Sequence, residues 1–240
     1  MRDARPADLA LLGLLQLADT SFPSGAYTLS HGLETLVADG LVHGADGLAE
    51  VIEVSLLSRF ARADLPAVLW SHDAARAIGA GDPAACARLV SVDRHLRASK
   101  LAREEREGSE RVGRRLVVEA AALAPSAALS AYENAIRGGE APGNSAVPFG
   151  VAAESFAIER RQAALAAGQA HATALAMAAL RLGLIGHREA QRVIRASVPL
   201  VQRAVEIAEA ASWLDFRPSA PQLDVSLARH EIAPARSFAS

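Results

Sequence analysis

Apolar residues recur every three or four positions along nearly the whole chain as far as Trp213. Strict alternation of apolar and polar residues, which is typical of strands, is almost absent. The spacing is clearest between residues 46 and 63, where one helical face collects Leu48, Val51, Ile52 and Leu56. The pattern therefore predicts an all-α protein, a single-domain helical bundle with short connections.

Proline and glycine divide this pattern into segments. Ser21-Phe22-Pro23-Ser24-Gly25 predicts a turn, and the glycine-rich stretch 138–145 is the longest expected loop. Pro66 and Pro83 stand where helices are expected to begin, because proline is favoured in the first helical turn. The expected helices cover approximately residues 8–17, 28–39, 46–63, 66–78, 83–96, 99–123 and 125–136, further helices up to residue 182, and residues 188–214.

The helical spacing ends after Trp213. Pro218, Pro221 and Pro234 interrupt the last segment, so residues 218–240 are expected to form an extended arm beside an all-helical domain of residues 1–217. The arm keeps apolar residues that a disordered tail does not need, namely Leu223, Val225, Leu227, Ile232 and Phe238. We therefore expect the arm to dock onto a partner, with few core contacts depending on it.

Two of the expected helices have unusual compositions. Residues 99–123 are the most charged, and pairs such as Glu107 with Arg111 favour a solvated surface helix. Residues 163–182 are apolar enough to resemble a membrane span, but their apolar character comes mostly from alanine, and polar residues such as His171 interrupt the run. We interpret this stretch as a buried helix of a soluble protein and expect no membrane association.

Charge and cysteine content narrow the class of protein. The net charge of −2 lacks the concentrated basic field that phosphate binding needs, so a nucleic-acid partner is not expected. Cys86 is the only cysteine, which excludes an internal disulfide and suits a reducing compartment. The first residues lack the cleavage pattern of a signal peptide. We expect a cytoplasmic protein.

No complete set of catalytic or metal-binding residues stands out in the sequence. His31 and Glu34 lie three positions apart, which on a helix would give half of a carboxylate-bridged metal site, but no matching second motif accompanies them. Zinc-type spacing, the Gly-x-Ser-x-Gly turn of many hydrolases and the nucleotide-binding P-loop are all missing. The sequence therefore predicts a non-catalytic protein without a cofactor or a metal site of its own.

One alternative stays open: a helical enzyme, or a small-ligand or metal-binding protein, that uses His31 and Glu34. The segment that contains them, residues 27–34, also puts Gly32 inside an expected helix, at a cost of ~1 kcal/mol relative to alanine. Close packing of two helices would explain that glycine. A surface for docking a partner would explain it as well.

Both ends of the chain resemble the UreF family. The N-terminal signature of that family is similar to Leu15-Gln16-Leu17-Ala18, Phe22-Pro23-Ser24-Gly25-Ala26-Tyr27 and Ser30-His31-Gly32-Leu33-Glu34. The family's ending is similar to Ala220-Pro221, Leu223-Asp224, Arg229-His230-Glu231, Arg236, Phe238 and Ser240. Further matches between the ends fall in the family order, so the resemblance covers essentially the whole chain. The chain departs from the family pattern at His187, Ala190, Pro234 and Ser237.

This resemblance implies a urease accessory protein, a non-catalytic homodimer that bridges a UreD/UreH-type scaffold and the nickel-carrying GTPase UreG. The bridging would take place on apo-urease, during nickel insertion and assembly of the metallocentre. It also implies that residues 229–240 dock into the scaffold and that the surface around Glu34 and Gln191 contributes to the GTPase interface. The expected partner-binding residues are Tyr27, Ser30, Glu34, Gln191, Arg229, His230, Glu231, Arg236, Phe238 and Ser240.

Overall fold

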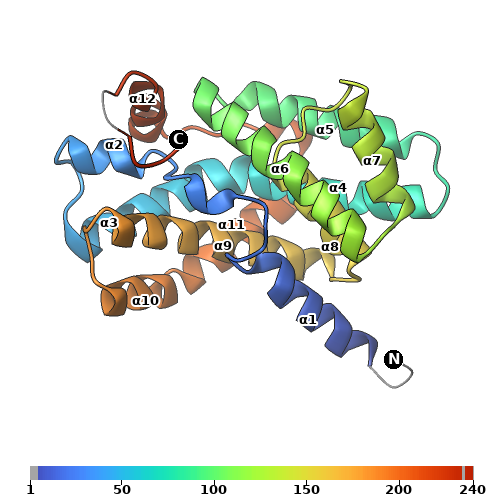
Figure 1. Ribbon diagram of the computed structural model, residues 1–240, viewed down its shortest axis with the longest axis horizontal. Helices are drawn as coiled ribbons and strands as arrows, with labels where there is room; N and C mark the ends of the chain where they lie inside the picture. The colour runs from blue at the N-terminus through green and yellow to red at the C-terminus, as the bar shows by residue number, and fades with distance from the viewer. Residues whose placement is uncertain (1–4, 234–235, 240) are drawn as a thin grey trace.

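The computed structural model describes residues 5–233 and 236–239, and within these ranges the chain is all-α without a strand (Figure 1). The fold class predicted from helical spacing is therefore confirmed. The α-helices are α1 (Pro6–Ala18), α2 (Leu33–Ala38), α3 (Gly44–Val54), α4 (Asp64–Gly79), α5 (Ala85–Ser99), α6 (Arg103–Leu123), α7 (Ala127–Arg137), α8 (Ala146–Ser155), α9 (Arg160–Arg181), α10 (His187–Ala196), α11 (Val198–Ala210) and α12 (Pro221–His230). Short turns of other helix types are η1 (Ala26–Thr28), η2 (Ser55–Arg59), η3 (Phe60–Arg62) and η4 (Trp213–Asp215).

Helix α4 lies at the centre of the bundle, in contact with α5, α8, α9 and α11. Its buried residues surround the helix axis, which is the pattern of a helix enclosed on all sides. Against it packs α8, whose Gly150 allows a very close backbone approach: a β-carbon at this position would lie 2.4 Å from the carbonyl oxygen of Val68. The glycine therefore fixes the distance between the two helices.

The glycine-rich loop of residues 138–145 is bound into the core. The buried carboxylate of Asp93 in α5 accepts hydrogen bonds from the backbone N–H of Gly143 (2.7 Å), from that of Asn144 (3.0 Å) and from the hydroxyl of Tyr132 (2.7 Å). Burial, together with the neighbouring Asp93 carboxylate, raises the pKa of Tyr132 well above its usual value. One aspartate thus joins α5, α7 and the loop before α8.

Three expected helices have different boundaries in the structure. The helix expected over 28–39 is shorter, because His31 (φ 53°) and Gly32 (φ 84°) adopt left-handed backbone conformations immediately before α2. The helix expected over 46–63 changes at residue 55 from the α-helix α3 to a single π-helical turn, η2, and then to η3. The long helix expected over 188–214 is two helices, α10 and α11, with Ser197 between them.

The expectation of an extended C-terminal arm is wrong for residues 221–230, which form α12. Pro221 occupies the first turn of this helix rather than interrupting one. Leu223 and Leu227 are buried, and a β-carbon on Gly32 would lie 3.2 Å from the side chain of Leu227. Figure 1 shows α12 beside α2 and the first turn of α6. Contacts of the folded body therefore do depend on this segment.

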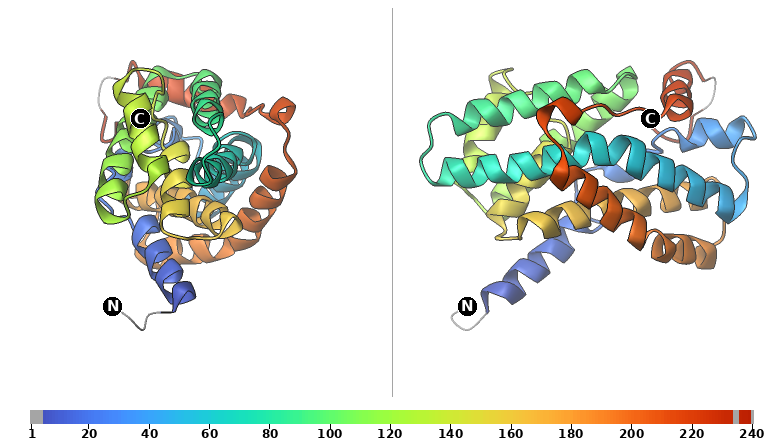
Figure 2. Two further views of the ribbon diagram at one scale, coloured as in Figure 1. Left: turned by 90° about the vertical axis from the view of Figure 1, so that its right-hand side faces the viewer. Right: turned by 180° about the vertical axis from the view of Figure 1, so that it is seen from behind.

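Helix α9 is the one helix in the described ranges that is long and apolar enough to cross a membrane. It packs against α1, α2, α3, α4, α8, α10 and α11, as expected for a core helix. Helix α1 differs, because it projects from the body in all three views (Figures 1 and 2). Its exposed apolar residues are Leu9, Leu11, Leu12 and Leu15. One face of α1 is therefore apolar and exposed to solvent.

Candidate functional site

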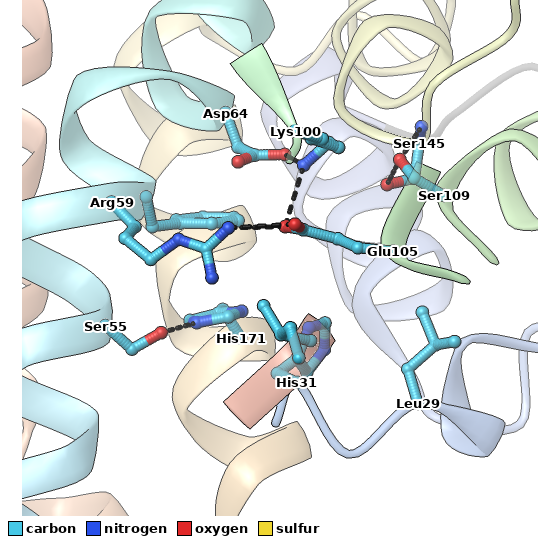
Figure 3. A pocket seen from close by; sticks show the side chains of 12 residues that line it. Leu29, His31, Ser55, Arg59, Asp64, Lys100, Glu105, Ser109, Ser145 and His171 are labelled. Atoms are coloured by element: carbon cyan, nitrogen blue, oxygen red, sulfur yellow. Dashed lines mark hydrogen bonds and ion pairs between the residues drawn. The ribbon is translucent and has the colours of Figure 1, made fainter. Parts of the chain in front are cut away.

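Two polar clusters each include a residue of α12, and both join segments that are far apart in the sequence. The first, here called the charge cluster, consists of Arg59, Asp64, Lys100, Glu105 and Asp224. The Glu105 carboxylate accepts hydrogen bonds from Nη2 of Arg59 at 2.8 and 2.9 Å and lies 3.6 Å from Nζ of Lys100. Lys100 donates to Asp64 at 2.9 Å, and Nε of Arg59 lies 3.5 Å from Asp224 of α12. Figure 3 shows Glu105 between the two cations.

The charges of this cluster stabilise one another in a buried setting. Burial alone would lower the pKa of Lys100, but the carboxylates of Asp64 and Glu105 outweigh it and the pKa is raised. Burial alone would raise the pKa of Glu105, but Lys100 and Arg59 outweigh it and the pKa is lowered. Lys100 and Glu105 are therefore both charged at neutral pH. Acids and bases that are paired in this way tie the elements together and do not exchange protons readily.

A pair of histidines lies next to the charge cluster (Figure 3). Nε2 of His171 lies 2.7 Å from the Ser55 hydroxyl in the π-helical turn, and its ring stacks on Phe60 at a centroid distance of 4.3 Å. The ring of His31 meets that of His171 edge-on at 4.8 Å. Burial lowers the pKa of His31 to about 4 and that of His171 well below its usual value. Both imidazoles are therefore neutral at neutral pH.

These side chains enclose a cavity of about 70 Å³ beneath the N-terminal segment, and a larger, mostly apolar cavity of about 470 Å³ adjoins it. Within the described ranges, no group of three or more His, Cys, Asp or Glu side chains is placed to hold a metal ion. Ser55 and His171 form a hydroxyl–imidazole pair, but no carboxylate within hydrogen-bonding distance orients this imidazole as a general base in the described part of the chain. The cavity therefore lacks the arrangement of a hydrolase or of a metal centre.

The second cluster, here called the tail cluster, consists of Glu34, Glu104, His230 and Arg236. His230, at the end of α12, places Nδ1 2.7 Å from Glu104 and Nε2 2.9 Å from Glu34. Arg236 forms an ion pair with the other oxygen of Glu104. Glu34 also accepts hydrogen bonds from the backbone N–H groups of Ser237 (2.6 Å) and Phe238 (3.2 Å). Two carboxylates from α2 and α6 thus hold the described part of the C-terminal segment, residues 229–233 and 236–239, of which residues 236–239 are called the tail below.

Neighbouring contacts extend this attachment. The Glu231 carboxylate accepts a hydrogen bond from the backbone N–H of Arg103 at 2.6 Å, where it satisfies a free donor in the first turn of α6. Arg229 pairs with Asp39 at the end of α2. Phe238 is buried, with the Arg181 guanidinium 4.3 Å from the centre of its ring. The C-terminal segment therefore contacts α2, α6 and α9.

The structure brings together several of the residues expected to bind partners, namely Glu34, Arg229, His230, Glu231, Arg236 and Phe238. Glu34 contacts His230 and Phe238 directly. The other three are held by residues outside this set, since Asp39 pairs with Arg229, Arg103 with Glu231 and Glu104 with Arg236. Ser30 is fully buried, whereas Tyr27 is 63% exposed and Gln191 lies exposed on α10. Ser240 and Pro234 lie outside the described residues.

His31 and Glu34 do not form the shared site of the alternative hypothesis. The left-handed backbone at His31 places it before α2, so the two residues do not share a helix face. His31 contacts His171, and Glu34 contacts His230. His31 therefore lies in the histidine pair beside the charge cluster, whereas Glu34 belongs to the tail cluster.

Sequence reasoning missed the partners that complete both clusters. Glu104 and Glu105 stand in the stretch expected to form a solvated helix, and His171 was seen only as an interruption of an apolar run. One signal was available, because Lys100 is the only lysine of the chain and precedes that stretch directly. Its partners Asp64 and Glu105 could not be inferred from spacing, since Asp64 lies 36 positions away.

Comparison with known proteins agrees with the resemblance at the two ends of the chain. The model of the UreF family matches residues 42–198. The chain belongs to the UreF family. It is 31% identical over 229 residues to the urease accessory protein UreF of Paenarthrobacter aurescens, which covers 95% of this chain and 97% of that protein. It is 31% identical over 230 residues to the protein of the same name from a Bacillus species, covering 96% and 99% of the two chains.

A third relative extends the agreement to the full length. The urease accessory protein UreF of Lachnoclostridium phytofermentans is 29% identical over 233 residues, with 97% of this chain and 100% of the relative covered. The UreF-family match therefore includes the N-terminal signature and much of the C-terminal segment, beyond the region that the family model matches. The expected family membership is confirmed.

Proposed function

We propose that this UreF-family protein is a non-catalytic urease accessory protein of the cytoplasm. In this role it bridges a UreD/UreH-type scaffold and the UreG GTPase on apo-urease while nickel is inserted. The proposal rests on how the C-terminal segment is attached. A few polar contacts and the side chain of one phenylalanine, Phe238, hold it on the surface of the body. Such a segment can exchange contacts within the chain for contacts with a partner.

In this proposal, residues 229–240 bind the scaffold. Arg229 and Arg236 remain partly exposed although each pairs with a carboxylate, and Ile232 is 84% exposed. Arginine and exposed aliphatic side chains are frequent at protein interfaces. Arg236→Ala should weaken scaffold binding more than Ser237→Ala, because the guanidinium offers five donors in a fixed fork.

The proposed GTPase surface lies at the end of the bundle that carries both α2 and α10, at the left of Figure 1. Gln191 is exposed there, and Glu34 lies under the C-terminal segment. The exposed leucines of α1 add an apolar surface of the kind that assemblies bury, and a homodimer is part of the proposal.

The test is urease activation in a host that carries the urease operon with this gene deleted and then restored. Restoration of nickel-dependent urease activity by the full chain, together with its capture of the scaffold and the GTPase in pull-down, is the expected result. A chain truncated before Arg229 should lose scaffold capture. A matched control, Arg203→Ala, removes an exposed α11 arginine that pairs with the exposed Glu206 in its own helix and should behave like the full chain. Normal urease activation in the deletion strain would refute the proposal.

The alternative, a ligand-binding protein, now rests on the cavity of about 470 Å³ rather than on a pair formed by His31 and Glu34. Its lining is mostly apolar, with His31 and His171 at the boundary to the smaller cavity. A stoichiometric small molecule carried through purification of the full chain, and identified by native mass spectrometry, would favour this alternative.

A further inference from the structure

We propose that His230 is a protonation-dependent latch, which holds the C-terminal segment on the body as a doubly protonated imidazolium between Glu34 and Glu104. The proposal concerns the isolated chain and does not depend on the identity of any partner. It rests on the placement of both ring nitrogens against carboxylates that come from two different helices.

A neutral imidazole cannot make both contacts. It has one N–H donor and one acceptor nitrogen, whereas an ionised carboxylate only accepts. His230 lies 2.7 Å from Glu104 through Nδ1 and 2.9 Å from Glu34 through Nε2, so both nitrogens must donate if both carboxylates are charged. The residue is 1% exposed, which leaves no room for bulk water to replace a lost donor. The geometry therefore selects the charged ring.

The charges around the ring balance only when it is protonated. Glu34 faces it from α2, Glu104 faces it from α6, and Arg236 of the tail occupies the far side of Glu104. Two pairs at the edges, Arg229 with Asp39 and Arg103 with Glu231, are each neutral in sum. Loss of the ring proton would leave two carboxylates facing one arginine in a largely buried site, which is costly.

The ring proton is coupled to the tail through Glu34. This carboxylate accepts from His230 and also from the backbone N–H groups of Ser237 and Phe238. Burial alone would raise the pKa of Glu34, but these hydrogen bonds and the His230 charge outweigh it, so its pKa is lowered. If His230 loses its proton, repulsion between its lone pair and one carboxylate displaces Glu34 or Glu104. Displacement of Glu34 releases the two backbone groups of the tail.

These contacts determine how the attachment of the tail changes with pH. The latch is closed while the two carboxylates are ionised and the ring is charged, and it opens as rising pH removes the ring proton. It also opens in acid, where the carboxylates become protonated.

The experiment uses the full chain and two readouts. Long-range ¹H–¹⁵N NMR of the histidine rings reports directly whether His230 carries two protons. Hydrogen exchange measured by mass spectrometry, corrected for the intrinsic effect of pH on exchange, reports the protection of residues 236–239. Between about pH 6 and pH 9, protection should fall on the order of tenfold, the equilibrium effect of losing one charge-assisted hydrogen bond.

Variants separate the latch from simple packing. His230→Gln keeps one donor and one acceptor but cannot carry charge, so its tail should be weakly protected at every pH. His187→Gln, at an exposed position of α10, should keep the wild-type profile. A singly protonated His230 ring near pH 6 in the wild-type protein would overturn the proposal even if His230→Gln fails to fold. Tail protection that is independent of pH, or equal in His230→Gln and wild type, would also overturn it.

Discussion

Removal of the Glu105 carboxylate should be among the most damaging single changes to the stability of this protein. Glu105→Ala leaves Arg59 without its two short hydrogen bonds and leaves Lys100 without the second of its carboxylate neighbours. The side chains of Arg59, Lys100 and Glu105 are only 13%, 8% and 16% exposed, so water cannot easily replace the lost carboxylate. The change therefore creates uncompensated positive charge inside the bundle.

The loss of stability in Glu105→Ala depends on which carboxylates still pair with Arg59 and Lys100. Breaking a buried ion pair by removing one partner costs about 3–5 kcal/mol. Lys100 keeps Asp64 at 2.9 Å and Arg59 keeps Asp224 at 3.5 Å, so neither cation is left entirely alone. We therefore expect the lower end, a loss of about 3 kcal/mol in the free energy of unfolding. For a chain of this size, that corresponds to a decrease in melting temperature of roughly 6–12 °C.

Urea denaturation followed by far-UV circular dichroism measures this change directly. The matched control is Glu107→Ala in the same helix, because the Glu107 side chain is 58% exposed and its pair with Arg103 is open to solvent. This control should lose less than about 0.5 kcal/mol. If Glu105→Ala and Glu107→Ala have equal midpoints, the charge cluster does not hold the fold together and the reasoning fails.

Four further results are expected. Gly150→Ala should cost about 1–3 kcal/mol in thermal or urea unfolding, because its β-carbon would clash with the α4 backbone, while Gly79→Ala, with open space around it, should cost nothing. Stability should fall by on the order of 2 kcal/mol for each of the two buried histidines between pH 7 and pH 5, since the unfolded chain takes up protons at His31 and His171 that the folded chain, with lowered pKa values, does not; urea midpoints that are flat over this range would contradict it. Deletion of residues 229–240 should lower the melting temperature measurably, because it removes buried side chains; an unchanged melting curve would count against the packing described. Calorimetric titration of the tag-free chain should reveal no sub-micromolar nickel site, and a GTPase assay no turnover; either activity would reopen the alternative function.

The sequence predicted correctly those features that depend only on residues close together in the chain. Helical spacing of apolar residues depends on the 3.6-residue period alone, so the all-α class followed without knowledge of any contact. The segments around Leu48 to Leu56 and from residue 163 to residue 182 were correctly assigned to helices that pack on the core. The UreF resemblance rested on ordered motifs and needed no fold.

The errors arose where one segment takes its structure from another. The three prolines after Trp213 predicted an extended arm, yet Pro221 begins α12. This helix packs its Leu227 side chain against Gly32, the residue that precedes α2. Likewise, Gly32 was expected inside a helix, and its positive φ places it just outside one. Short helices gain most of their stability from packing, so their own sequence indicates them weakly.

The sequence by itself thus determined the helical class, the family and the near-neutral charge that argues against nucleic acid. Only the tertiary structure decided which charges meet. His230 finds Glu34 across 196 positions and Glu104 across 126, and Arg59 finds Glu105 across 46. No periodicity reports such pairings, because they are created where η2, α2, α6 and α12 meet in space rather than by the repeat of any one helix. Electrostatic interactions depend on distance and burial in space, and both exist only after the chain has folded.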